Sequence, residues 1–84
     1  MFTVYVLQGS MGRFYKGMTE NLDRRLAEHR AGETKTTRTM RNICVVYTET
    51  TEAAAEARKR EKYLKSGAGR RFLKSRLQSD SIRP

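Results

Sequence analysis

The hydrophobic positions of the chain follow two kinds of pattern. Short runs rich in β-branched and aromatic residues favour strands, and they cover Phe2–Leu7, Phe14–Thr19 and Asn42–Thr50. Stretches with helical spacing of apolar residues, or with strong helix formers, favour helices, and they cover Leu22–Arg30, Glu52–Lys65 and Gly69–Leu77. The turn sequence QGSMG between the first two runs predicts a hairpin. The pattern therefore predicts the order β-β-α-β-α-α.

Local signals mark where the predicted helices begin and end. Asn21 is a good N-cap for the first helix, and Thr51 is expected to cap the second. Ser66 and Gly67 are expected to end the second helix, because glycine tolerates the left-handed conformation. Residues 31–41 lack apolar periodicity and are expected to form a loop, which either is simply solvated or closes over a substrate.

The predicted fold is α+β, with a small three-stranded antiparallel sheet flanked by helices. Residues 1–78 are expected to form one domain, since 84 residues leave no room for a second. Residues 79–84 are expected to be a disordered tail. The one cysteine, Cys44, excludes an internal disulfide and is expected in the core, because it lies in the apolar run ICVVY.

The net charge of the chain indicates that this small domain binds polyanions. Eighteen Lys and Arg against nine Asp and Glu give a net charge of +9 at pH 7. A basic surface gains affinity for nucleic acid by releasing phosphate counterions. The same charge also occurs in non-specific binders or serves solubility alone. No apolar run is long enough to span a membrane and no signal peptide is evident, so we expect a cytoplasmic or nucleoid-associated protein.

Two polar side chains are predicted on the apolar side of the first helix. Leu22 and Leu26 define that side, and the 100° rotation per residue brings Arg25 and His29 onto it, whereas Arg24 points away. A desolvated arginine is costly unless it meets an anion or water. A snorkelling arginine and a hydrogen-bonded core histidine would explain the positions without function.

The second helix repeats this feature with a carboxylate. Glu61 falls within the apolar stripe of Ala57 and Leu64, amid a strongly basic stretch. An ion pair with Lys65 or Arg58 along the helix is one explanation, worth only about 0.2–0.5 kcal/mol. A carboxylate beside a phosphate-binding surface is also what a Mg²⁺ site needs, since Mg²⁺ takes one or two carboxylates together with substrate phosphate.

The hairpin contributes two phenols. If its turn centres near Ser10, Tyr5 and Tyr15 lie opposite each other on one face of the sheet. Such a pair often serves core packing. Each phenol is also an acid, a base or a hydrogen-bonding group where it borders a cleft, and Gly17 leaves room for a close approach. Together with the residues on the two helices, the pair suits phosphodiester hydrolysis.

These residues resemble the GIY-YIG nucleases. Thr3-Val4-Tyr5 and Tyr15-Lys16-Gly17 are similar to the two half-motifs of that family, and Arg25 and His29 follow at the family spacing. Glu61 falls where the family has its metal-binding glutamate. The string RKREKYLKSGAGRRFL is similar to the small stand-alone bacterial branch called YhbQ-like, and the resemblance covers about residues 2–77.

The resemblance implies a metal-dependent endonuclease acting on DNA, in repair or in the processing of structured or single-stranded DNA. Glu61 would hold one divalent cation, Mg²⁺ or Mn²⁺, and Tyr5 or Tyr15 would help to deprotonate the attacking water. Arg25 would stabilise the charge on the scissile phosphate, and His29 would assist in proton transfer or contact phosphate. Family members leave 5′-phosphate and 3′-hydroxyl ends. A partner protein from DNA repair is a further expectation.

The chain departs from the family pattern at two positions, with Thr3 in place of Gly and Lys16 in place of Ile or Val. Lys16 should point to the sheet face opposite Tyr15, where it either stands exposed or contacts phosphate. Larger family members carry a separate DNA-binding domain, so here the basic surface is expected to bind the substrate itself. The residues expected to do so are Lys16, Arg24, Lys35, Arg58, Lys62, Lys65, Arg70 and Arg71.

Two other classes of function remain open on the sequence alone. A non-catalytic nucleic-acid-binding module would keep the fold and the basic surface, and a protein-interaction domain would keep the fold only. Retention of Tyr5, Tyr15, Arg25, His29 and Glu61 together favours catalysis, because an inward glutamate repels phosphate unless a metal is present.

Overall fold

A computed structural model describes residues 1–10, 12–33, 37 and 40–81, with backbone alone for 78–81. The elements in chain order are β1 (Phe2–Gln8), β2 (Phe14–Thr19), α1 (Leu22–Arg30), β3 (Cys44–Thr51), α2 (Ala54–Lys65) and α3 (Gly67–Ser81). The three strands form one antiparallel sheet in the order β2-β1-β3. The predicted α+β fold and its β-β-α-β-α-α order are therefore confirmed.

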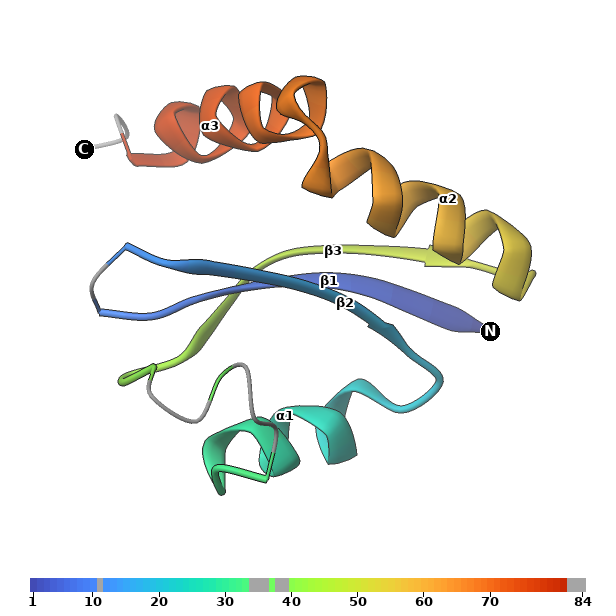
Figure 1. Ribbon diagram of the computed structural model, residues 1–84, viewed down its shortest axis with the longest axis horizontal. Coiled ribbons are helices and arrows are strands. Elements are labelled where there is room, and N and C mark those ends of the chain that lie inside the picture. Colours follow the sequence, from blue (N-terminus) through green and yellow to red (C-terminus); the bar gives the residue numbers. More distant parts are fainter. Residues whose placement is uncertain (11, 34–36, 38–39, 82–84) are drawn as a thin grey trace.

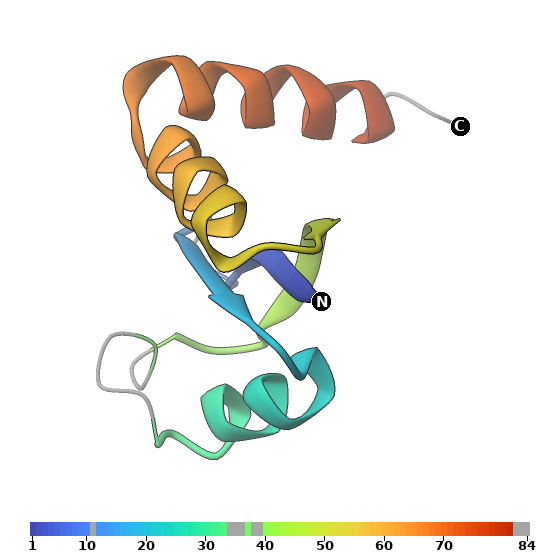
Figure 2. The same cartoon turned by 90° about the vertical axis from the view of Figure 1, so that its right-hand side faces the viewer.

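The helices lie on both faces of the sheet, with α1 on one side and α2 and α3 on the other (Figures 1 and 2). The central strand β1 is consequently buried on both faces, which explains its nearly continuous apolar sequence. Val4 and Val6 pack with α2 and α3, whereas Tyr5 and Leu7 pack on the side of α1. Alternation along one strand thus divides the core into two clusters.

The hairpin register differs from the expected one. Tyr5 lies opposite Gly17, and Tyr15 lies opposite Leu7, so the two tyrosines are diagonal neighbours instead of a directly opposed pair. They still share a face, and their ring centroids are 6.2 Å apart, because diagonal positions lie within reach of aromatic side chains. A Cβ at Gly17 would lie 2.7 Å from the Tyr5 Oη atom. The space above Gly17 is therefore occupied by the Tyr5 phenol.

The junction between α2 and α3 corrects the predicted helix ends. Ala53 is the N-cap of α2 without a side-chain hydrogen bond, and Thr51 belongs to β3 instead of capping the helix. Ser66 ends α2 with φ −79°, so no left-handed glycine is used, and Gly67 begins α3. The Ser66 hydroxyl accepts a hydrogen bond from the Gly69 amide and so caps α3.

Two further expectations are wrong. The backbone remains helical to Ser81, so residues 79–81 belong to α3 and not to a tail, while 82–84 lie outside the described residues. Cys44 is exposed, because it is the first residue of the edge strand β3 and not part of the core. No helix in the described part of the chain is long and apolar enough to cross a membrane.

Candidate active site

Helix α1 carries two of the predicted site residues toward the sheet. The Asn21 side chain accepts a hydrogen bond from the Arg24 amide at 3.1 Å and sets the start of the helix. From there the helical rotation buries His29, which is only 1% exposed, and leaves Arg25 half-buried. Leu22 and Leu26 pack against the cluster that contains Tyr5. The spacing thus brings both polar residues to the face predicted for them.

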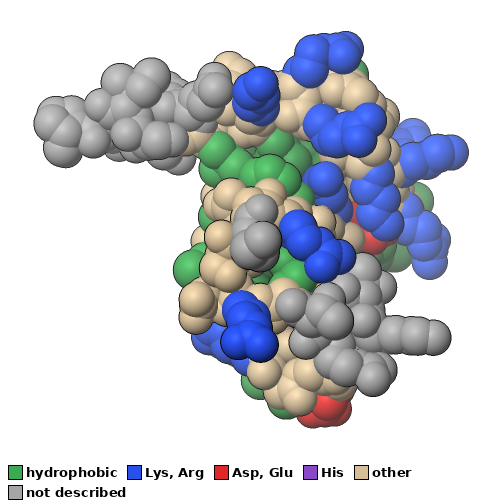
Figure 3. Space-filling view, turned by 60° about the vertical axis from the view of Figure 1, so that its left-hand side comes forward, with side chains coloured by type: hydrophobic (Ala, Val, Ile, Leu, Met, Phe, Trp, Pro, Cys, Tyr) green, Lys and Arg blue, Asp and Glu red, His purple; other side chains and the backbone are tan. Residues whose placement is uncertain are grey.

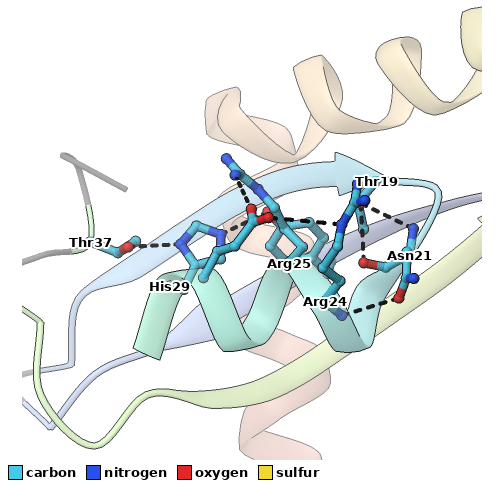
Figure 4. Close-up of polar contacts among 8 residues, drawn as sticks. Thr19, Asn21, Arg24, Arg25, His29 and Thr37 are labelled. Carbon is cyan, nitrogen blue, oxygen red and sulfur yellow. Dashed lines mark hydrogen bonds and ion pairs between the residues drawn. The ribbon is translucent and has the colours of Figure 1, made fainter. Parts of the chain in front are cut away.

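The His29 imidazole is hydrogen-bonded at both nitrogens. Its Nε2 atom is 2.9 Å from the Tyr5 Oη atom, and its Nδ1 atom is 2.7 Å from the Thr37 Oγ1 atom. Figure 4 shows Thr37 beside the ring. Burial lowers the pKa of His29, and the positive charge of Arg25 lowers it further. The ring is therefore neutral at pH 7 and can accept a hydrogen bond.

The two phenols differ in their surroundings. Tyr5 is 1% exposed, whereas Tyr15 is half-buried and packs edge-on against the His29 ring, with centroids 4.9 Å apart. Burial raises the pKa of the Tyr5 phenol, hydrogen bonding from Arg25 opposes this change, and the negative charge of Glu61 adds to it. The pKa of the Tyr5 phenol is thus influenced by residues from three other elements, β2, α1 and α2.

Arg25 is held in place by an acidic neighbour on its own helix. Its Nη1 atom donates to the Glu28 Oε1 atom at 2.8 Å. The hydrogen bond to Glu28, followed by that to Tyr5, raises the pKa of the guanidinium, which is permanently charged. Arg24 differs, since its side chain is 75% exposed and its Nε atom is 3.8 Å from Glu28. Arg25 therefore presents an ordered cation next to the phenols, and Arg24 does not.

Glu61 reaches the same region from the other side of the sheet. Its side chain is 24% exposed, and its Oε2 atom is 3.5 Å from the Lys65 Nζ atom, longer than the about 2.7–2.9 Å of a charge-assisted hydrogen bond. The intrahelical pair with Lys65 is therefore present but loose. Its negative charge raises the pKa of the Tyr5 phenol, so the two groups influence each other across the sheet.

The donor set fits one divalent cation with a single protein carboxylate. Within the described ranges, no three His, Cys, Asp or Glu side chains lie close enough together to form a metal cage. Mg²⁺ does not need such a cage, because it commonly uses one or two carboxylates, several waters and substrate phosphate. Glu61, loosely paired and partly exposed, matches this type of site.

One known protein family matches most of this chain. The GIY-YIG catalytic domain family matches residues 1–74. The chain belongs to the GIY-YIG family. This GIY-YIG domain is 41% identical to a UPF0213 protein of Natronomonas pharaonis over 78 residues, covering 92% of the chain and 89% of the relative. A UPF0213 protein of Halobacterium salinarum is 39% identical over 66 residues, covering 77% and 86%.

A solved structure gives the same result for the fold. The solution NMR structure of a UPF0213 protein from Bacillus halodurans superimposes with a TM-score of 0.56 at 32% identity, covering 89% of this chain and 84% of that one. The relatives place this GIY-YIG domain in the small UPF0213 branch, which is the YhbQ-like branch that the sequence resembled. The family is one of nucleases that bind nucleic acid.

The basic residues of this GIY-YIG domain lie mostly on its surface. Figure 3 shows Lys and Arg side chains gathered on one face, beside an acidic group. Lys16 is half-buried on the sheet face opposite Tyr15, where burial lowers its pKa and the charges of Arg70 and Lys65 lower it further. The predicted contact residues that are exposed are Arg24, Arg58, Lys62, Lys65, Arg70 and Arg71. Lys35 was also predicted to contact nucleic acid, but residues 34–36 and 38–39 lie outside the described residues.

Two residues of the site were missed by reasoning from the sequence. Glu28 could have been found, since a carboxylate three residues after Arg25 is within reach along a helix. Thr37 could not, because it lies in a segment without periodicity, and its contact with His29 is a tertiary one that no local pattern indicates. The candidate site of this GIY-YIG domain thus includes residues outside the family motifs.

Proposed function

We propose that the chain is a divalent-metal-dependent endonuclease that hydrolyses phosphodiester bonds of DNA. The observation that carries this proposal is the convergence of Tyr5, Tyr15, Arg25 and His29 on one face of the sheet, together with the influence of the Glu61 charge on the Tyr5 phenol. A module that only binds nucleic acid has no use for an inward carboxylate next to its phosphate-binding cations.

Arg25 is the residue proposed to bind the scissile phosphate. Glu28 accepts from one N–H group of the guanidinium, and because a guanidinium has five N–H donors, others can meet phosphate oxygens in the geometry that arginine favours. The side chain is 35% exposed, so a substrate can reach it without a large rearrangement. Charge develops on the phosphate oxygens in the transition state, and a fixed cation stabilises that charge.

Tyr15 is proposed to help deprotonate the attacking water: its phenolate oxygen would accept that proton and become the neutral phenol. It is the more exposed of the two phenols, and a general base must come within hydrogen-bond reach of its water. Tyr5, buried and hydrogen-bonded to His29, instead orients Arg25. The burial of His29 supports a role through Tyr5 over direct contact with phosphate.

Glu61 is the proposed ligand for one Mg²⁺ or Mn²⁺ ion. When bound, such an ion supplies positive charge that polarises the phosphate and stabilises the leaving oxygen. Lys65 lies beside this carboxylate, and the charges of Lys65 and Arg70 both act on Lys16. These three cations would hold the phosphates that flank the cut. The DNA would then cross the β2 edge of the sheet.

The matched pair of arginines on α1 provides the test. Single-stranded, duplex, flap and junction DNA are incubated with the protein and Mg²⁺, and the initial rates of Arg25→Ala and Arg24→Ala are compared. We expect Arg25→Ala to lose at least about 100-fold in rate and Arg24→Ala to lose less than about threefold. Equal losses for the two variants, or DNA binding without cleavage of any substrate, would reject the catalytic assignment.

A further inference from the structure

Phe14 is an aromatic side chain that the fold leaves at the surface. The chain has three phenylalanines, of which Phe2 and Phe72 pack against the core, whereas Phe14 is 41% exposed. Among the described residues, Met1 is the only other large hydrophobic side chain that is exposed. A single exposed aromatic residue is common in proteins, so its meaning depends on what surrounds it.

The surroundings of Phe14 are cationic. The Lys16 Nζ atom lies over the Phe14 ring, 5.6 Å from the ring centroid. Alternation along β2 puts Phe14, Lys16 and Met18 on the sheet face that α2 and α3 cover (Figures 1 and 2), and Met18 packs against the core there. Burial lowers the pKa of Lys16, and the positive charges of Arg70 and Lys65 lower it further. Further cations therefore lie close enough to act on the lysine that covers the ring.

Two of these cations are not neutralised by a carboxylate. In the described part of the chain, neither Lys16 nor Arg70 forms an ion pair with an acidic side chain. Arg70 is exposed in the first turn of α3, and Lys16 is half-buried beside Phe14. Both charges are therefore available to phosphate groups that come near the Phe14 ring.

Phe14 also has a defined place relative to the candidate active site. It is the first residue of the edge strand β2 and is directly followed by Tyr15, the proposed base. Tyr15 packs on the side of α1, against the His29 ring, so Phe14 lies on the other face of the sheet. A DNA strand that crosses the β2 edge with one phosphate near Tyr15 therefore brings a neighbouring nucleotide to Phe14.

An aromatic ring among cations is the combination with which proteins bind single-stranded nucleic acid, because bases stack on the ring and cations hold the phosphates. A base within a continuous duplex is already stacked between its neighbours and has no free face. An unpaired base in a single strand or a flap does have one. Every base has such a face, so this kind of contact selects unpaired DNA without selecting a sequence.

We propose that Phe14 is the platform on which an unpaired base of the DNA substrate stacks, while Lys16 and Arg70 hold the adjoining phosphates. The substrate class is then single-stranded or flapped DNA, in preference to continuous duplex. This inference rests on the proposed function for the path of the DNA across β2. It concerns binding, however, and binding can be measured without cleavage.

Two single strands of equal length and charge test the proposal. One strand carries thymine at every position, and the other carries an abasic site at every position, so the ratio of their Kd values measures what the bases contribute. Binding is followed by fluorescence anisotropy in EDTA at one salt concentration. We expect the wild type to bind the thymine strand at least about fivefold more tightly than the abasic strand. In Phe14→Leu this ratio should fall at least about fivefold, while the affinity for the abasic strand stays within about twofold.

The controls separate stacking from apolar contact and from loss of structure. Phe14→Tyr retains an aromatic ring and should keep the wild-type ratio. Phe72→Leu removes a ring that packs against the core and should keep it too. Phe14→Leu should bind blunt duplex within about twofold of the wild type, and its slope of log K against log salt should not change, because no cation is removed. All variants are compared at a temperature at which circular dichroism shows them folded.

The outcomes separate this proposal from the proposed function. An equal ratio in the wild type and Phe14→Leu, or a wild type that does not distinguish the two strands, would overturn the stacking role even if DNA were cleaved. A ratio that falls in Phe14→Leu and is kept in Phe14→Tyr would support the role even if no DNA were cleaved with Mg²⁺. In that case the failure would belong to the endonuclease assignment.

Discussion

Replacement of Gly17 by alanine tests the packing that holds the site together. The added Cβ would lie 2.7 Å from the Oη atom and 2.8 Å from the Cζ atom of Tyr5, and 3.1 Å from Cε1 of Tyr15. Carbon atoms pack at about 3.5–4.0 Å, so the Tyr5 ring would have to move by about 0.7 Å or more. The ring is buried between the sheet and α1 and has little room to move.

The size of the effect follows from what this movement breaks. Overpacking of a core costs about 1–3 kcal/mol, and leaving the buried Tyr5–His29 hydrogen bond unmade costs about 1–3 kcal/mol more. We therefore expect Gly17→Ala to lose at least about 2 kcal/mol of unfolding free energy. For a domain of this size each kcal/mol corresponds to about 4–8 °C, so the melting temperature should fall by at least about 8 °C.

Thermal and urea unfolding followed by circular dichroism provide the assay, with Gly67→Ala as the matched control. A Cβ at Gly67 meets no atom closer than 3.6 Å, and the residue lies in the first turn of α3. Alanine there should be neutral or stabilising by up to about 1 kcal/mol. If Gly17→Ala is as stable as Gly67→Ala, the close packing of Tyr5 against β2 is wrong.

Three further results are expected. Burial would raise the pKa of Glu49, but hydrogen bonds from Arg60 and Tyr47 lower it. The free energy of unfolding that this carboxylate contributes is therefore present above its unfolded pKa of about 4.3 and is lost as the pH falls through the lower folded pKa. In urea unfolding at decreasing pH, Glu49→Gln should lack this loss. Burial lowers the pKa of His29, so the unfolded chain binds more protons. The melting temperature should then fall as the pH drops from about 7 to 5 in the wild type but not in His29→Gln. Lys16→Ile should weaken DNA binding and reduce the slope of log K against log salt by about 1. Lys59→Ala is the control and should change the affinity less, because Lys59 lies about 200° around α2 from Glu61.

The sequence predicted the parts of the fold that depend on local periodicity. The rotation of 100° per residue was enough to assign His29 to the buried side of α1 and Arg24 to solvent, because helix geometry varies little between proteins. Alternation along strands likewise put Tyr5 and Tyr15 on one face. The directly opposed pairing failed, because register depends on the geometry of the turn.

Features set by tertiary contacts could not be predicted in this way. Cys44 lies in an apolar run, yet its exposure depends on β3 being an edge strand, which only the strand order shows. Gly67 resembled a helix stop, but Gly69 allows α3 to begin close against the end of α2, where a Cβ would overlap the Tyr63 backbone. The contact of Thr37 with His29, eight residues earlier in the chain, has no signature in the local sequence pattern.

The metal dependence of cleavage by the wild type and by Glu61→Gln tests the central claim most directly. A fluorescent DNA substrate is incubated with EDTA, Mg²⁺ or Mn²⁺, and binding is measured in parallel by anisotropy. We predict that the wild type cuts only with a divalent cation, and that Glu61→Gln binds the DNA but cuts it at least about 100-fold more slowly. Cleavage by the wild type in EDTA, or wild-type rates for Glu61→Gln in Mg²⁺, would contradict the account.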